Sequence, residues 1–444
     1  MNMMIYIKKI LTLFLIITFV QVNGQELLSK KEAVQLALEN NYGIKIANND
    51  LKIAENNKDI LNSGYLPTLS GNAGANYRKA DSETEFETNP PNNVDGAESK
   101  TYNASIGANY LLFNGFARQN TFKLLKEQYN LTELQARQVI ENTLITLFIA
   151  YYEVARLTEN ETIQKNNLAV SKQRLLRANY AFEYGQNTRL DVLNAEVDIN
   201  NDSINYLDSK LLLVNSKRDL NVVLGRDVNT ALQISTDVEY ILGLALVDLQ
   251  QKSKTTNASL LLAEKNIELG KYDIKINKAT YMPNVALTSS YAWNKSDNDP
   301  TSPFSPISTM QTGLNAGLNL TWDIFDGGRT KTRVKNAKIQ LENSEILLQQ
   351  EKEQLNRDLN NAWEIYQNRL FTLQAQRNSL ETNIINFDRS NEQFKLGQIS
   401  SIDFRQAQIN LNNAELNVSL AKYSAKNAEL RVLQLSGELL NIEF

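Results

Sequence analysis

Two long stretches of the chain repeat their apolar residues with the period of an α-helix. The first contains Ile140, Leu144, Leu147, Phe148, Tyr151 and Val154, and the second contains Leu355, Leu359, Ala362, Tyr366 and Leu373. All seven prolines lie elsewhere, within 67–91 and 283–306. No Gly occurs between Phe116 and Tyr184, or between Arg329 and Leu396. Because Pro breaks helix interiors, the pattern predicts two helices of about 100 Å, each packed along one stripe.

A strand-like alternation occurs in the two proline windows. Four runs of about 9–11 residues place apolar side chains on one face and polar side chains on the other, near 68–78, 101–112, 285–294 and 313–323. A tilted strand needs this length to cross a bilayer, and aromatic residues lie near the ends of the apolar faces. We expect surface loops at 79–100 and 295–311. A soluble β-sandwich with one buried face is the alternative.

The second half of the chain repeats the first. Tyr65-Leu66-Pro67 recurs as Tyr281-Met282-Pro283, at an offset of 216 (281 − 65). Leu112-Phe113-Asn114-Gly115 recurs as Ile324-Phe325-Asp326-Gly327, at an offset of 212 (324 − 112), and a third block recurs from Phe182 to Phe394 at the same offset. We therefore predict two tandem repeats, 25–233 and 234–444, each running helix, β-hairpin, long helix, helix. The linker at 225–240 holds a strand-like run at 231–235.

A short motif follows each long helix. It reads Gly185-x-x-Thr188-x-x-Asp191 in the first half and Gly397-x-x-Ser400-x-x-Asp403 in the second. The Gly suits the left-handed residue that ends a helix, and the hydroxyl residue and the Asp have the spacing of a capping box. The motif predicts tight helical hairpins with tips at 185–191 and 397–403. The Asp pair then has two compatible roles, which are helix capping and a ring of carboxylates at the mouth of a tube.

The N-terminus and the composition narrow the function. Lys8 and Lys9 precede an apolar run too short to span a membrane, so residues 1–24 are predicted to be a secretory signal peptide cleaved before Gln25; a retained anchor is the alternative. The chain has no Cys and no His, which excludes Ser-His, Cys-His and zinc hydrolases. A net charge of −4 argues against nucleic acid as a partner. We expect no enzymatic activity, no cofactor and no metal site.

The strand count predicts an oligomer. Four strands cannot close a barrel, and an open strand edge is not tolerated in lipid. The smallest bacterial barrels have about eight strands, so several copies of the chain must combine.

The motifs also carry a family resemblance. The repeated Tyr-x-Pro, Phe-[Asn/Asp]-Gly and Gly-x-x-[Ser/Thr]-x-x-Asp-x-x-x-Ala, in this order, resemble the TolC-like outer-membrane efflux proteins over about 26–437. The resemblance implies a mixed α/β membrane protein: a homotrimer whose 12-stranded β-barrel in the outer-membrane lipid continues into a periplasmic α-helical barrel. It also implies two partners, a periplasmic adaptor protein and an inner-membrane transporter of the RND or ABC type.

Candidate site residues follow from the resemblance and from the strand faces. Asp403 matches the first entrance Asp of the family, Gln406 stands at the second position, and Phe394 and Ile399 stand where the family has a latch of Tyr and Arg. The candidate entrance residues are Asp403, Gln406, Asp191 and Asn194. The candidate adaptor-docking residues are Gly185, Thr188, Gly397 and Ser400. The candidate lumen residues of the barrel are Asn103, Asn109, Asn315 and Asn319.

The leading hypothesis is therefore an outer-membrane exit duct, extending into the periplasm, for small molecules delivered by a pump. An exit duct for type I protein secretion has the same architecture. A periplasmic coiled-coil scaffold without a pore belongs to a different class, and the alternating strands argue against it. A carboxylate-based glycan hydrolase would need two converging carboxylates, and no motif marks such a pair.

Overall fold

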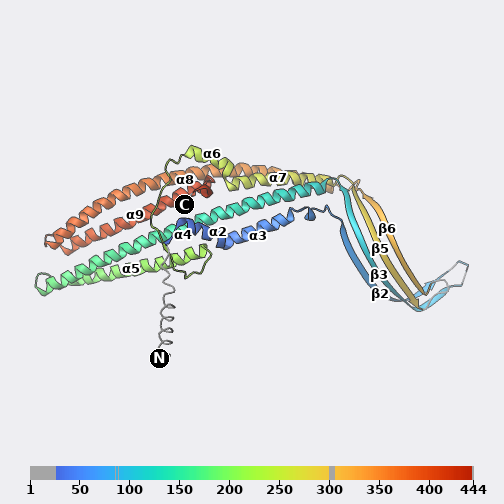
Figure 1. Ribbon diagram of the computed structural model, residues 1–444, viewed down its shortest axis with the longest axis horizontal. Helices are drawn as coiled ribbons and strands as arrows, with labels where there is room; N and C mark the ends of the chain where they lie inside the picture. Colours follow the sequence, from blue (N-terminus) through green and yellow to red (C-terminus); the bar gives the residue numbers. More distant parts are fainter. Residues whose placement is uncertain (1–26, 86, 89, 300–305, 443–444) are drawn as a thin grey trace, which may run out of the picture. The chain divides into compact units, whose positions relative to one another are not determined.

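A computed structural model describes residues 27–85, 87, 88, 90–299 and 306–442 (Figure 1). The predicted signal peptide lies outside these residues. The chain divides into two compact units. The helical unit contains the residues up to Asn49, Leu134–Leu261 and the residues from Glu351 on, and the sheet unit contains Asp50–Glu133 and Leu262–Gln350.

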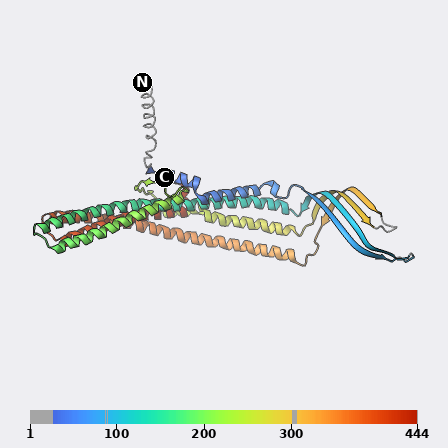
Figure 2. The same ribbon diagram turned by 90° about the horizontal axis from the view of Figure 1, so that it is seen from below.

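Four helices form two pairs of equal length. The long helices α4 (Ala117–Glu183) and α8 (Arg329–Lys395) have 67 residues each, and α5 (Arg189–Val223) and α9 (Ser401–Leu435) have 35 each. The two long helices that the absence of Pro and Gly predicts are confirmed. The helices α4 and α5, and likewise α8 and α9, form hairpins closed at a tip (Figures 1 and 2). The other described helices are α2 (Lys30–Asn40), α3 (Tyr42–Asn57), η1 (Ile60–Asn62), α6 (Leu246–Thr256), α7 (Ala258–Ala279) and η2 (Leu439–Asn441).

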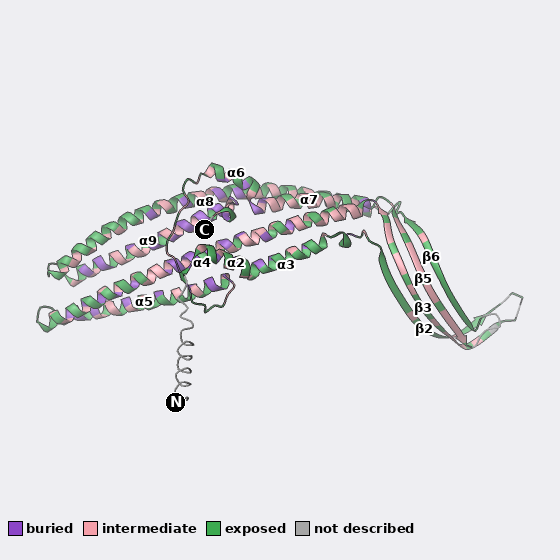
Figure 3. Cartoon of the chain, viewed as in Figure 1, coloured by how far each residue is buried: buried purple, intermediate pink, exposed green. Residues whose placement is uncertain are grey.

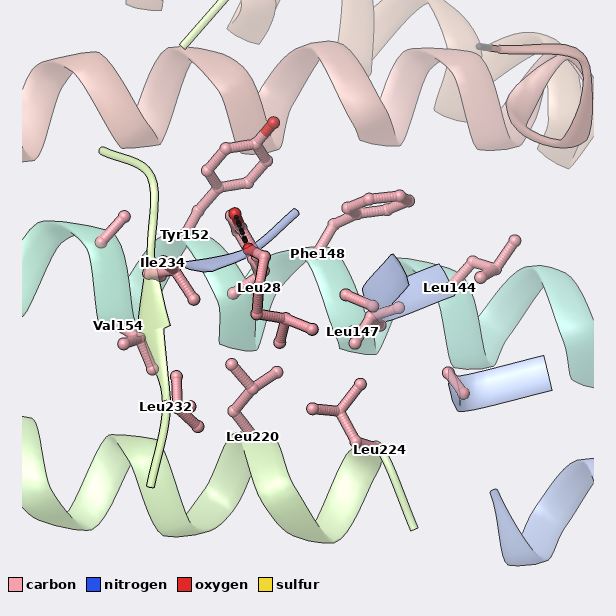
Figure 4. Close-up of a cluster of buried hydrophobic side chains, with 14 of the residues drawn as sticks. Leu28, Leu144, Leu147, Phe148, Tyr152, Val154, Leu220, Leu224, Leu232 and Ile234 are labelled. Atoms are coloured by element: carbon pink, nitrogen blue, oxygen red, sulfur yellow. Dashed lines mark hydrogen bonds between the residues drawn. The ribbon is translucent and has the colours of Figure 1, made fainter. Parts of the chain in front are cut away.

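The main core of the helical unit forms around the apolar row of α4. Leu144, Leu147, Phe148, Tyr151 and Val154 are all buried there, as their helical spacing predicts. Side chains from α5 and from the linker meet them (Figure 4), and the Tyr151 hydroxyl donates a hydrogen bond of 2.9 Å to the Leu28 carbonyl. The apolar row predicted on α8 is also buried, from Leu355 to Leu373.

The linker between the halves is held against α9. Its strand β4 is limited to Gln233–Ile234 and pairs in parallel with β1 (Leu27–Leu28), so the strand-like run at 231–235 is only partly a strand. Farther on, the Tyr240 hydroxyl donates to the Lys422 carbonyl over 2.7 Å, and the Ile241 N–H donates to the buried Glu429 carboxylate over 3.1 Å. These polar contacts tie a segment without regular structure to the helix beneath it.

The sheet unit contains four antiparallel strands in the order β2-β3-β5-β6. Their bounds are Thr68–Thr84, Asn92–Asn114, Asn284–Asp299 and Ser308–Thr321. The pairing brings the predicted apolar faces together, because Ile106 lies opposite Tyr291 and Leu287 lies opposite Leu318. Among the residues that the structure describes, no strand pairs with the outer edge of β2 or of β6.

The strands extend farther than the alternation predicts, which corrects the loops expected at 79–100 and 295–311. The pair β2–β3 continues to Thr84 and Asn92, and β5 continues to Asp299. Cross-strand polar pairs support these extensions: Lys79 lies 3.2 Å from Glu98. Charged residues are compatible with these strand extensions, because the extensions do not pack against a hydrophobic core and need no apolar face.

No described side chain of these four strands is buried (Figure 3). Leu69, Ile106, Tyr291 and Leu318 are all exposed on the apolar face. The described residues thus leave uncovered the face that a soluble sandwich would bury. Separately, no helix among the described residues is both long and apolar enough to cross a membrane.

Candidate functional site

The first hairpin tip is a tight turn fixed by local contacts. Gly185 follows α4 with a φ of 71°, in the left-handed region that favours Gly. The Gln186 N–H donates back to the Ala181 carbonyl over 2.7 Å. Thr188 and Asp191 form a capping box, in which the Thr188 N–H donates to the carboxylate (3.0 Å) and the Asp191 N–H donates to the hydroxyl (3.4 Å). The predicted cap and capping box are confirmed.

The second tip has the same construction. Gly397 has a φ of 73°, and the Gln398 N–H donates to the Gln393 carbonyl over 2.8 Å. The Ser400 N–H donates to the Asp403 carboxylate over 3.3 Å, and the Asp403 N–H donates to the Ser400 hydroxyl over 3.2 Å. Local chemistry thus fixes the direction in which α9 leaves the turn.

The candidate entrance residues occupy the first two turns of the helices that leave the tips, α5 and α9. Asp403, Gln406 and Asn194 are exposed, and Asp191 is half-buried. Both cap contacts of Asp403 use its Oδ2 atom, so the carboxylate caps α9 while its charge faces solvent. Gln406, in contrast, donates to Asn410 over 2.8 Å on the helix surface.

An aromatic stack within the second hairpin, near its tip, receives a cation from the first hairpin. Phe394, at the latch position of the resemblance, stacks on buried Phe404 with ring centroids 4.7 Å apart. The Arg177 guanidinium of α4 lies 5.4 Å from the centre of the Phe394 ring. The contact between hairpins at this position is therefore a cation–π contact. Its members lie on α4, α8 and α9, and sequence reasoning missed Arg177 and Phe404.

A buried cluster of charges makes the second contact between the hairpins. Arg405 of α9 binds Asp202 of α5 through both terminal nitrogens, over 2.7 and 2.9 Å, and its Nε lies 3.5 Å from Asp198. Arg174 of α4 pairs with Asp198, and the Ser171 hydroxyl donates to Asp202 over 2.5 Å. Two positive and two negative side chains thus balance within one cluster.

Burial is the main cause of the lowered pKa of Arg174 in this cluster. Asp202, Ser171 and Arg174 are all buried. Burial, followed by repulsion from Arg405, lowers the pKa of the Arg174 guanidinium to about 10. Sequence reasoning missed the cluster because its members are far apart along the chain. The available signal was Arg405 itself, which is charged where the first half has Leu193 at the equivalent position.

The four candidate lumen residues lie on the polar face of the sheet. Asn103 lies opposite Asn294, Asn109 opposite Thr288, and Asn315 opposite Ser290. The Asn319 amide donates to the Thr288 hydroxyl over 3.0 Å. The paired segments hold no charged residue on either face, over 68–76, 101–109, 284–294 and 311–321. The register therefore brings Asn, Ser, Thr and Gly together on one uncharged polar surface.

The described residues contain no group of three or more Asp and Glu side chains that could hold a metal ion. What the arrangement offers is a set of surfaces: two capped tips, an uncharged polar face, and an uncovered apolar face.

Comparison with known proteins identifies the family. The sequence profile of the family described as "Outer membrane efflux protein" matches residues 33–226 and 249–438. The chain is 24% identical to the outer membrane efflux protein BepC of Brucella suis, over 96% of this chain and 91% of that one. It is 22% identical to the toluene efflux pump outer membrane protein TtgC of Pseudomonas putida, over 92% of this chain and 82% of that one.

Solved structures share the fold. The CmeC outer membrane channel of Campylobacter jejuni superposes with a TM-score of 0.76 at 16% identity, covering 92% of this chain and 86% of that one. The open state of the MtrE outer membrane channel of Neisseria gonorrhoeae gives a TM-score of 0.70 at 17% identity, covering 92% and 89%. The two matches of the family profile cover most of the sequence. The chain therefore belongs to the outer membrane efflux protein family and is an outer-membrane protein.

Proposed function

We propose that this chain forms the exit duct of a tripartite efflux system. The observation that carries the proposal is the four-stranded sheet with an uncovered apolar face, an uncharged polar face and two unpaired edges. Lipid against the apolar face and water against the polar face would satisfy both. The capped hairpin tips would then serve the periplasmic entrance of the duct.

The unpaired strand edges support a trimer. In a membrane, the edges of β2 and β6 would leave backbone N–H and C=O groups without partners. Pairing β6 of one copy with β2 of the next removes both edges, and three copies close a barrel of twelve strands. The repeats 25–233 and 234–444 would then supply six similar units around one axis.

The tips support docking and gating at the periplasmic end. Gly185, Thr188, Gly397 and Ser400 shape two exposed turns on which a periplasmic adaptor can dock. Asp403, with Gln406, Asp191 and Asn194, would line the entrance, and three copies of Asp403 form a carboxylate ring there. An inner-membrane pump would deliver the cargo through the adaptor.

Small molecules are the cargo that we propose. The name of the relative from Pseudomonas putida associates that protein with toluene efflux. On the face assigned to the lumen, Asn103, Asn109, Asn315 and Asn319 form an uncharged wall, which suits solutes of either charge. Selection among cargoes would then fall to the pump.

Sedimentation and conductance test the proposal together. Protein extracted from outer membranes in mild detergent should sediment as a trimer and produce discrete conductance steps in planar bilayers. Deleting the gene should increase accumulation of a dye that the cognate pump exports. A monomer in detergent, or a trimer without conductance, would contradict the duct. Unchanged dye accumulation combined with loss of a secreted protein would instead assign the duct to protein secretion.

A further inference from the structure

The two helical hairpins can be compared position by position. α4 and α8 begin at Ala117 and Arg329, and α5 and α9 begin at Arg189 and Ser401. Both differences are 212 (329 − 117 and 401 − 189), and the members of each pair have equal length. Every position of the first hairpin therefore has an equivalent in the second hairpin at this one offset.

Arg405 of α9 also reaches Asp202 of α5, but the main contact between the two hairpins joins α4 to α9. The equivalent contact would join α8 to α5. In Figure 1, α9 and α4 separate these two helices, and no hydrogen bond or ion pair between described residues joins them. The described part of the chain thus contains one of the two helix contacts that its repeats define, the contact of α4 with α9.

The contact that is present is polar at its centre. Glu159 of α4 accepts a hydrogen bond from the Ser419 hydroxyl over 2.8 Å and from the Tyr423 hydroxyl over 3.0 Å, and it pairs with Lys422. Several turns closer to the tips, the Gln408 amide donates to the Ser171 hydroxyl over 2.9 Å. Around Glu159, hydrogen bonds and an ion pair therefore hold α9 against α4, while the Tyr423 ring and Leu430 also pack in the apolar core around α4.

The equivalent set is apolar and uncovered. Phe371 of α8 stands where α4 has Glu159, and its side chain is 75% exposed. On α5, Leu207 and Leu211 stand where α9 has Ser419 and Tyr423, and they are 60% and 58% exposed. Lys210, at the position of Lys422, is the only member of the set that keeps its character.

These two leucines belong to a longer stripe on α5. Spaced alternately by four and three residues, its members are Leu193, Val197, Asn200, Ile204, Leu207, Leu211 and Val214. This is the spacing of a helix that packs against a second helix in a coiled coil. Every apolar member of the stripe is exposed, so no helix in the described part of the chain covers it.

We propose that the missing partner is α8 of a second copy, with its Phe371 seated between Leu207 and Leu211 of the first. The proposal rests on the trimer proposed above and defines its helical interface. The occupant follows from the repeat, because the helix equivalent to α4 is α8. The order of strands agrees, since the edge strands β2 and β6 belong to the first and the second repeat.

The change from polar to apolar suits the change from an internal to an external contact. Within one chain, the covalent linker keeps the partners together, so the half-buried ion pair of Glu159 and Lys422 only has to fix their register. Between copies, association must offset lost translational and rotational freedom, and burial of apolar surface is the main driving term. Phe371 and the α5 leucines supply that surface where the internal contact uses Glu159.

Disulfide trapping tests the contact directly, because the chain has no native Cys. The full-length double variant F371C/L207C, oxidised in the outer membrane, should run as a covalent trimer on a non-reducing denaturing gel and as a monomer after reduction. Each single variant should stay monomeric. The pair E159C/S419C is the matched control, because its disulfide should form within one chain without raising the mass. The pair F371C/L193C, whose second site is displaced by about 21 Å along α5, should not cross-link.

Placing the polar residues around Glu159 at the equivalent positions of α8 and α5 tests which side chains stabilise the trimer. F371E should lose most of the trimer in detergent, because a carboxylate would then face two leucines. The triple variant F371E/L207S/L211Y should recover the trimer, since with native Lys210 it recreates the set around Glu159. Circular dichroism would verify that each variant is folded.

The two proposals fail in different ways. A monomeric wild-type protein would overturn the trimer itself. A wild-type trimer in which F371C/L207C does not cross-link, or cross-links only to a different protein, would overturn this interface alone. A yield of trimer for F371E equal to that of the wild type would also overturn this interface.

Discussion

Gly115 and Gly327 have nearly the same backbone conformation, with φ angles of 66° and 69°, but only Gly115 has another segment of the chain against it. A Cβ atom at Gly115 would lie 2.3 Å from the carbonyl oxygen of Ala279, whereas a Cβ at Gly327 would meet no heavy atom within 4 Å. Equivalent glycines of the two halves thus have different reasons to be Gly. The first needs both the conformation and the space, and the second needs the conformation.

Gly115→Ala should therefore destabilise the protein more than Gly327→Ala. Each substitution places an L-residue in the left-handed region, at about 1–2 kcal/mol. Gly115→Ala must also displace backbone, which adds about 1–3 kcal/mol. Thermal unfolding followed by circular dichroism measures both variants, and Gly327→Ala serves as the matched control. Equal midpoints would show that the Ala279 carbonyl moves away without cost.

Asp403→Asn should reduce cation selectivity in planar bilayers. Three carboxylates around the entrance would favour cations, and Asn removes the charge while keeping an oxygen that can accept the cap hydrogen bonds. Asp191→Asn should have a smaller effect, because Asp191 is half-buried and Asp403 is exposed. Asp219→Asn, at an exposed site on α5 far from the tip, controls for loss of charge. If a trimeric Asp403→Asn channel keeps its selectivity, the carboxylate is only a cap.

Much of this fold could be predicted from the sequence because local chemistry specifies it. The absence of Pro and Gly predicts α4 and α8, and the spacing from Ser400 to Asp403 predicts the start of α9 to the residue. Alternation along β6 predicts which face holds Leu318 and which holds Asn319. These features depend only on residues within a few positions of one another.

The parts that could not be predicted depend on distant or unusual neighbours. Arg405 and Asp202 are 203 positions apart, so no local pattern joins them. Phe116 has a φ of 67°, where its equivalent is Gly328 with a φ of 86°, and an aromatic residue gives no hint of that conformation. The strands continue past Lys79 because that side chain pairs across the ladder with Glu98. Such contacts are set by tertiary structure.

Arg405→Leu should destabilise the helical unit by about 3–5 kcal/mol. The substitution leaves Asp202 buried without its bidentate partner, although Leu stands at the equivalent position, Leu193, in the first half. Adding Asp202→Asn should recover part of the loss, because the uncompensated charge disappears. Urea unfolding of the detergent-extracted protein measures the stability of the wild type, of Arg405→Leu and of the double variant. Arg389→Leu, at an exposed site on α8, should change stability by less than about 0.5 kcal/mol. A loss for Arg405→Leu no larger than this would mean that the cluster is solvated.

Leu318→Arg should impair assembly far more than Asn319→Arg, although the two residues are neighbours on β6. Leu318 lies on the apolar face opposite Leu287, and an Arg facing lipid near the bilayer midplane costs about 2–4 kcal/mol. Asn319 lies on the polar face opposite Ala286, so Arg there should leave the trimer intact and change its conductance. Trimer yield in outer-membrane extracts and single-channel currents measure the two effects. Equal tolerance at both sites would reverse the assignment of faces.

The register of the strands at the boundary between copies can be derived from the register inside one chain. β3 and β5 join the two repeats, with Asn109 opposite Thr288. The residue equivalent to Asn109 in the second repeat is Thr321 on β6 (109 + 212). The residue equivalent to Thr288 in the first repeat is Asn72 on β2 (288 − 216). Asn72 and Thr321 both lie on polar faces. An odd shift would instead turn one apolar face toward the lumen.

The double variant N72C/T321C should therefore form covalent trimers when oxidised, because Thr321 of one copy would face Asn72 of the next. The pair N76C/T321C is displaced by four residues, or about 13 Å along β2, and should remain largely uncross-linked. Both pairs keep the thiols on the polar face, so solvent access is matched. If N76C/T321C cross-links more than N72C/T321C, the boundary between copies does not repeat the β3–β5 register. In that case the barrel would have a different stagger, and the equivalence of the two repeats would stop at the edge of the sheet.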